Sequence, residues 1–255
     1  MKTSVVIPAT PGNFVFLNSV IQNYAEGTVK PDEVVVSLSN GHYVNGIDVL
    51  EERFSSVFED FKVLRHNKVM VQGPNRDAAT MATKNEIIIS NDADDVPHPQ
   101  RIEVIKHFFE TQDILHLNHS YQKNFGWNNV DIDNIKVLSC EETFNHHFPL
   151  YRGQAYEGRR PNPREYGYHR PYGSDIFGGN DTQTHCGCPA FHRDVFDTIR
   201  WRHTEERAWD IDFVLDVLFT FRKSIIIDSK LLWYNISMER RNSQSAESLG
   251  SLYRR

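Results

Sequence analysis

The sequence predicts an α/β protein built on a mostly parallel central sheet with helices on both faces. Short apolar, β-branched runs alternate with amphipathic segments of helical period through residues 1–100. Such alternation requires crossover connections, which make neighbouring strands parallel. The chain of 255 residues, 39% hydrophobic and 12% aromatic, is also long and apolar enough to bury a sizeable core.

The first strand is expected at residues 4–7, where Pro8 ends it. A helix should follow, because apolar side chains recur at helical spacing between residues 14 and 24. The second strand should cover residues 33–38 and end in the turn residues 39–41. No G-x-G-x-x-G follows the first strand, which argues against a nicotinamide-binding Rossmann domain, the natural alternative.

The remaining elements of this half continue the alternation. We expect an amphipathic helix over residues 47–57, a short strand at 61–64, a helix at 75–83 and a fourth strand at 86–90. Gly73 and Pro74 mark the start of the third helix. The order of strands and helices therefore favours one sheet whose strands share a carboxyl-terminal edge.

The second half is less regular. Helices are expected at residues 101–110, 195–199 and 210–219, and strands at 114–121, 135–139, 225–227 and 231–234. Residues 145–187 are rich in Gly, Pro, Arg, Tyr and His without periodicity, which is typical of a substrate loop. The chain should therefore be one domain with two halves, 1–100 and 101–235, followed by a polar tail, 236–255.

The most informative segment is the acidic cluster at residues 91–95, with the sequence N-D-A-D-D. It follows the apolar run Ile87-Ile88-Ile89 and precedes Pro97, so it should lie at the carboxyl end of a strand, where α/β folds bind ligands. Carboxylates this close repel one another unless a cation or a network of donors stands among them. The cluster therefore indicates a hard divalent ion with oxygen ligands, and a diphosphate is the expected cargo of such an ion.

Two other interpretations of the cluster are weaker. A solvated acidic turn explains many short Asp runs but ignores the strand that precedes this one. A calcium loop would place Asp92, Asp94 and Glu103 at its positions one, three and twelve. That pattern fails because Pro97 stands at position six, where the turn needs glycine.

Charge and cysteine content exclude further classes. The net charge of −6 provides no basic stripe for nucleic acid, so DNA and RNA are not expected as partners. No window approaches the ~20 apolar residues of a transmembrane segment. Three cysteines are too few and odd in number for a disulfide framework, so we expect a soluble, cytoplasmic protein.

Five segments together resemble a known family. They are S-V-V-I-P at residues 4–8, E-V-V-V-S at 33–37, G-P-N-R-D at 73–77, N-D-A-D-D at 91–95 and W-D-I-D-F at 209–213. In this order and spacing the chain resembles a GT-A fold glycosyltransferase of the family 2 type, with a D-x-D motif. The resemblance spans most of the chain and implies a nucleotide-sugar donor bound by residues 1–100 and an acceptor bound by residues 101–235.

The resemblance also implies roles for individual residues. Asp92 and Asp94 would ligate Mn²⁺ or Mg²⁺, with Asp92 also facing the ribose or sugar, and Asp210 would be the general base of an inverting transfer. Gly187 would let the acceptor-side loop approach the substrate. The expected contacts of the nucleotide-sugar are Pro8, Ala9, Thr10, Ser39, Asn40, Arg76, Asp77, Asp92 and Ala93.

The resemblance implies a UDP-sugar in preference to a GDP-sugar as the donor, and a carbohydrate or glycoconjugate as the acceptor. Three departures from the family pattern matter. Ser37, Ser39 and Asn40 stand where an acid usually binds the base, and Trp209 replaces the first acid of the base element. The carboxy-terminal His that often completes the metal shell in the family is missing from residues 234–239. The alternatives are a non-catalytic sugar-binding module and a nucleotidyltransferase. The second lacks support because residues 5–16 contain no Arg or Lys.

Overall fold

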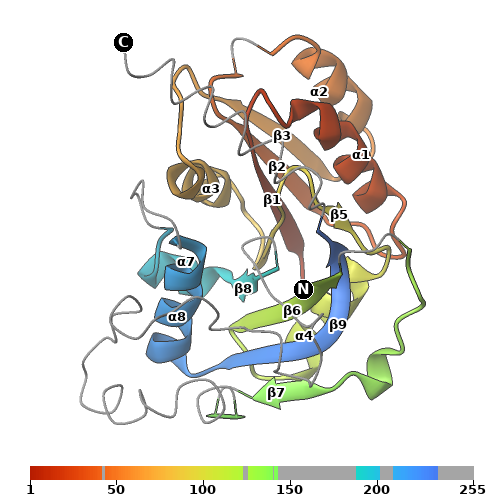
Figure 1. Ribbon diagram of the computed structural model, residues 1–255, viewed down its shortest axis with the longest axis vertical. Coiled ribbons are helices and arrows are strands. Elements are labelled where there is room, and N and C mark those ends of the chain that lie inside the picture. Colours follow the sequence, from red (N-terminus) through yellow and green to blue (C-terminus); the bar gives the residue numbers. More distant parts are fainter. Residues whose placement is uncertain (42–43, 123–125, 140, 143–187, 202–208, 235–255) are drawn as a thin grey trace.

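A computed structural model describes residues 1–41, 44–122, 126–139, 141–142, 188–201 and 209–234 (Figure 1). The first half contains β1 (Thr3–Ala9), α1 (Phe14–Ala25), β2 (Glu33–Leu38), α2 (Ile47–Ser55), β3 (Asp60–Arg65), α3 (Gln72–Met81) and β4 (Ile87–Ser90). The second half contains β5 (Val96–Pro97), α4 (Arg101–Thr111), β6 (His116–Gln122), η2 (Ile132–Asn134), β7 (Val137–Ser139), β8 (Ala190–His192), α7 (Arg193–Thr198), α8 (Trp209–Phe221) and β9 (Ser224–Trp233).

The described strands form one mixed sheet in the order β3-β2-β1-β4-β8-β6-β9-β5, with β7 paired to β9. The strands β3, β2, β1 and β4 are parallel, and so are β6 and β9, whereas β8, β5 and β7 pair antiparallel with their neighbours. The predicted α/β class with a mostly parallel central sheet flanked by helices is confirmed.

Two apolar cores cover the two faces of the sheet (Figure 1). The first packs α1, α2 and α4 against alternate residues of the strands, such as Val5, Val34 and Ile87. The second packs α3, α7 and α8 against the residues between them, such as Val6, Val35 and Ile88. Neighbouring strand residues point to opposite faces, so these unbroken β-branched runs are buried from both sides.

The order of the parallel strands creates a topological switch between β1 and β4. The chain passes from β1 through β2 to β3 on one side, with α1 and α2 on one face, and returns through α3 on the other face to β4. Crossovers of one hand place the helices on opposite faces when the direction reverses. The carboxyl ends of β1 and β4 then border the switch point, which is where open α/β sheets bind ligands.

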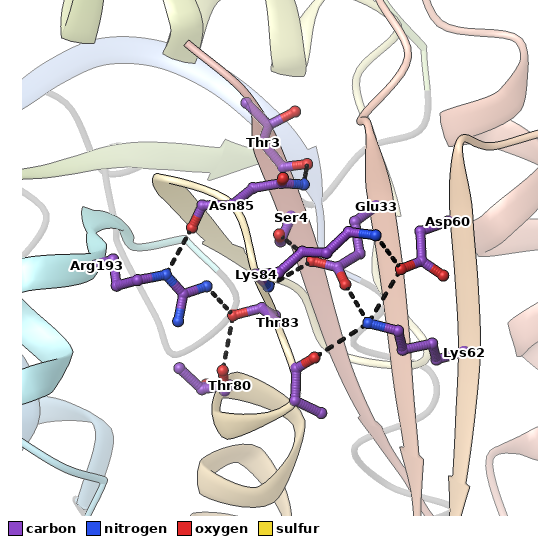
Figure 2. A network of polar contacts seen from close by, with 11 residues as sticks. Thr3, Ser4, Glu33, Asp60, Lys62, Thr80, Thr83, Lys84, Asn85 and Arg193 are labelled. Atoms are coloured by element: carbon purple, nitrogen blue, oxygen red, sulfur yellow. Dashed lines mark hydrogen bonds and ion pairs between the residues drawn. The ribbon is translucent and has the colours of Figure 1, made fainter.

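A polar network holds the opposite, amino-terminal edge of the sheet (Figure 2). The carboxylate of Glu33 is fully buried and accepts hydrogen bonds from Lys62 Nζ at 2.6 Å, Ser4 Oγ at 2.5 Å and the Lys84 backbone N–H at 2.9 Å. A buried carboxylate is costly unless it is paired in this way. The three partners come from β3, β1 and the segment between α3 and β4, so the network ties these elements together.

The structure departs from the sequence expectations at three strands. Phe191, which precedes the helix expected at residues 195–199, belongs to β8 and pairs with Ile88 of β4 and His116 of β6, and α7 begins at Arg193. The two strands expected at residues 225–227 and 231–234 form one strand, β9 (Ser224–Trp233), because the segment continues through a register shift against β6. Val96 and Pro97 form a short strand at the end of the sheet, where a missing N–H donor is tolerated.

None of the helices in the described ranges combines the length and the apolarity that crossing a membrane requires.

Candidate active site

The acidic turn, defined as residues 91–95, follows β4 directly, as the sequence predicts. Asn91, which is fully buried, fixes its shape: its Nδ2 donates to the backbone oxygens of Asp92 at 2.6 Å and Asp95 at 3.0 Å. A backbone hydrogen bond from Asp95 N–H to Asp92 O at 3.2 Å closes the turn. Asp92 and Asp94 are partly exposed, so these two carboxylates remain in contact with solvent at the edge of the sheet.

A buried guanidinium lies beneath the turn. Arg101, at the start of α4, is fully buried and donates to Asn91 Oδ1, to Tyr24 Oη at 2.7 Å and to Ser90 O at 2.8 Å. Its Nε donates to His119 Nε2 at 3.1 Å, which makes that ring a neutral acceptor. Burial raises the pKa of Tyr24 to about 12, against the effect of Arg101, so its hydroxyl keeps its proton and donates to Asn91 Oδ1 at 2.8 Å.

A second buried guanidinium reaches the turn from α3. Arg76 has no exposed surface, and it donates to Ser90 Oγ and to an oxygen of Asp92, with which it forms an ion pair. Gln72 Nε2 lies 3.4 Å from the same carboxylate oxygen. Charge-assisted hydrogen bonds of this kind are strong and fix the position of the carboxylate. The protein itself thus supplies one cation among the crowded carboxylates.

Asp77, the next residue of α3, has a different partner. Its nearly buried carboxylate accepts two hydrogen bonds from Arg200, from Nε at 2.9 Å and from Nη2 at 2.5 Å. Arg76 and Asp77 therefore do not form an exposed ion pair with each other, because both residues are buried and bind other side chains. Arg76 binds a residue of the acidic turn, and Asp77 binds a residue of the segment that follows α7.

The ends of β1 and β2 are joined at the same edge. Ala9 O accepts hydrogen bonds from the Ser39 backbone N–H at 2.9 Å and from Asn75 Nδ2 at 3.0 Å. Thr10 is exposed, and its N–H donates to Asn13 Oδ1 at 2.6 Å. Asn40 adopts a left-handed conformation with φ of 54°, which directs the chain out of β2. The structure therefore gathers Thr10, Asn40 and the acidic turn at one edge.

The expected acceptor-side residues are less fully described. Asp210 is the second residue of α8, so it lies in the first turn of a helix, as predicted, but its side chain is outside the described part of the structure. Gly187 and the loop at residues 145–187 also lie outside the described residues, as does the tail at 236–255.

Several residues that shape the edge were not foreseen from the sequence, namely Tyr24, Asn75, Asn91 and Arg101. Arg101 carried a usable signal, because a cation in the first turn of a helix opposes the helix dipole and needs a specific partner to offset that cost. Asn91 carried another, since a polar residue directly after an apolar strand must satisfy its amide where the strand ends.

Structures similar to this chain confirm its architecture. One is S. aureus TarS 1-349 in complex with UDP-GlcNAc, with a TM-score of 0.61 and 11% identity over 92% of this chain and 58% of that one. Another is the mannosyltransferase PcManGT from Pyrobaculum calidifontis in complex with GDP-Man and Mn²⁺, with a TM-score of 0.53 and 13% identity over 90% and 56%. The chain has the GT-A fold. Mannosyl-3-phosphoglycerate synthase from Rubrobacter xylanophilus shares it, with a TM-score of 0.51, 15% identity and 94% and 70% covered.

The likeness of this GT-A chain is one of fold and not of sequence. No protein-family model matches it, and no curated protein matches it in sequence. The chain also spans only 58% of the length of the TarS 1-349 structure. What these proteins bind and do therefore supports a proposal for this chain and does not by itself establish its activity.

The oxygen atoms available at this edge suit a hard divalent cation only when a substrate supplies further ligands. Within the described residues, no group of three or more His, Cys, Asp or Glu side chains could hold a metal ion. Asp92 and Asp94 offer carboxylate oxygens on one turn, and Mg²⁺ is typically bound by one or two carboxylates together with substrate phosphates and waters. The edge of the GT-A sheet therefore fits a cation that arrives with a diphosphate.

Proposed function

We propose that this chain is a glycosyltransferase that moves a sugar from a nucleotide-diphosphate-sugar to a hydroxyl group of a carbohydrate or glycoconjugate acceptor. The observation that carries the proposal is the acidic turn at the end of β4, beside the end of β1, at the topological switch of a GT-A sheet. The UDP-GlcNAc named with TarS and the GDP-Man named with PcManGT support this class of donor.

The donor would lie across the carboxyl ends of β1, β2 and β4. The base and ribose would contact Thr10 and the end of β2, with Pro8, Ala9 and Ser39 shaping the backbone there, and the diphosphate would lie above Asp92 and Ala93. Arg76 would act by orienting Asp92, since it is fully buried and bonded to that carboxylate. A UDP-sugar is proposed in preference to a GDP-sugar.

A divalent cation fits this arrangement. Asp94 and Asp92 would hold Mn²⁺ or Mg²⁺ against the diphosphate, and the Mn²⁺ named with PcManGT is in keeping with this. The cation would neutralise charge on the leaving nucleotide diphosphate. Arg76 already balances part of the charge of Asp92, so Asp94 is the ligand whose loss should matter most for the metal.

The acceptor would be activated by Asp210. At the second position of α8 its carboxylate is favoured as an anion by the helix amino terminus. It would take the proton of the acceptor hydroxyl as that oxygen attacks the anomeric carbon. The nucleotide diphosphate would leave from the opposite side, so the configuration would invert.

A donor panel tests the proposal. UDP- and GDP-sugars are incubated with the protein and Mn²⁺ or Mg²⁺, and release of nucleotide diphosphate is measured with Asp94→Asn as the matched variant. We expect release from at least one donor and loss of metal-dependent nucleotide binding in Asp94→Asn. Binding without release from any donor would indicate a sugar-binding module, and release of pyrophosphate from a nucleoside triphosphate would indicate a nucleotidyltransferase.

A further inference from the structure

Two adjacent side chains of α3 point toward different parts of the molecule. Arg76 binds Asp92 of the acidic turn, whereas Asp77 binds Arg200, which follows α7. The Asp77–Arg200 contact is bidentate, and the Asp77 side chain is only 6% exposed. A planar guanidinium held at two points on a buried carboxylate is geometrically specific, unlike an ordinary surface ion pair.

Trp201 extends this contact to α8. Its ring is buried, its Nε1 donates to Thr80 Oγ1 of α3 at 3.1 Å, and it stacks on Phe213 of α8 with centroids 3.8 Å apart and planes 19° apart. The guanidinium of Arg76 lies over the same ring, 5.4 Å from its centroid. Phe213 lies one helical turn after Asp210, so this stack fixes the part of α8 that carries the proposed base.

We propose that Asp77, Arg200 and Trp201 are positioning residues that hold the first turn of α8 at a fixed place relative to the acidic turn. This inference rests on the proposed function and assigns Asp77 to the acceptor side of the reaction rather than to the donor. Helix α3 then fixes the positions of both elements that carry acidic residues of the proposed reaction. Arg76 orients Asp92, and Asp77 orients the helix that carries Asp210. The separation between donor and base is thereby fixed by neighbouring residues of a single rigid element.

The first test is the kinetics of Asp77→Asn, which keeps the shape of the side chain and removes the charge that holds Arg200. Misplacement of a catalytic group by about 1 Å can cost about 100-fold in rate. We therefore expect kcat to fall by about 10- to 100-fold with the KM for the donor unchanged. Because the two residues act as a pair, adding Arg200→Gln to Asp77→Asn should lower kcat no further.

Arg193→Gln is the matched control (Figure 2). Arg193 begins α7 and also reaches the α3 region, donating to Asn85 O at 2.9 Å and Thr83 Oγ1 at 2.8 Å, but at the amino-terminal edge. Its loss removes a comparable arginine contact without touching α8. It should lower the free energy of unfolding by a similar amount and leave kcat unchanged. An equal fall of kcat in both variants would overturn the inference.

Hydrogen exchange separates this inference from the proposed function. Amides of residues 213–217 in α8 should exchange faster in Asp77→Asn than in Arg193→Gln, because only the first variant loosens the contact with α8. A wild-type protein that releases nucleotide from no donor would refute the proposed function, while equal exchange in the two variants would refute the role of Asp77, whatever the activity.

Discussion

His116 should make the stability of this protein fall steeply in mild acid. It is the first residue of β6, has no exposed surface, and neither of its ring nitrogens has a hydrogen-bond partner among the described residues. Ser224, its neighbour in β9, likewise has a buried hydroxyl without such a partner there. Burial lowers the pKa of His116 from 6.5 to about 3, because the charged ring would lose its hydration with no group to replace it.

The sign and size of the effect follow from this difference in pKa. Below pH 6.5 the unfolded chain binds a proton at this ring, whereas the native protein does not until the pH approaches 3. Proton binding therefore stabilises the unfolded state relative to the native state as the pH falls. At about 1.4 kcal/mol per pH unit, a change from pH 8 to pH 5 should lower the free energy of unfolding by about 2 kcal/mol through His116 alone.

Urea denaturation followed by circular dichroism at both pH values measures this effect. The pKa values of His66 and His98 are also lowered by burial, so the quantity to compare is the difference between wild type and His116→Leu. That difference should shift by about 2 kcal/mol in favour of the variant between pH 8 and pH 5. Leu117→Val, at the neighbouring buried position, should lower stability equally at both pH values. If wild type and His116→Leu showed the same pH dependence, the reasoning would be wrong.

Three further predictions concern the candidate site. Asp210→Asn should lower kcat by about 10²- to 10⁴-fold with little change in donor affinity. Asp212→Asn, about 200° further round the helix, should lower kcat much less. Equal losses of kcat in steady-state assays would remove Asp210 from the mechanism. UDP or GDP should slow hydrogen exchange around Thr10 and the acidic turn, and protection confined to residues 145–187 would contradict this placement. Tyr24→Phe, which removes a donor from Asn91, should cost about 1–3 kcal/mol of unfolding free energy in urea titrations.

The parallel half of the fold was predictable because its strands are determined locally. In β1, β2 and β4, nearly every residue is buried, and the unbroken β-branched runs could only be buried strands. By contrast, β8 is three residues long, and its conformation is set by pairing with β4 and β6. Sequence periodicity cannot detect an element of only a few residues, and Phe191 fits a helix equally well.

The place of the acidic turn at the end of β4 was predictable, but the contacts around it were not. The acidic turn and the Arg76-Asp77 pair lie where the motifs indicate, yet Asp77 is bound by a residue 123 positions away in the chain. Arg101 and Tyr24 meet Asn91 only because α1 and α4 pack on the same face. Such partners depend on the assembled sheet, and no local pattern in the sequence encodes them.

The polar network around Glu33 has a consequence for engineering this protein. It closes the edge of the sheet that is remote from the acidic turn, through contacts among β1, β2, β3 and the segment before β4 (Figure 2). The parallel strands are thus held at one end by side chains that lie away from the proposed donor site. Under the proposed function, substitutions of Thr10 at the other end should change donor preference while the framework that supports it stays intact.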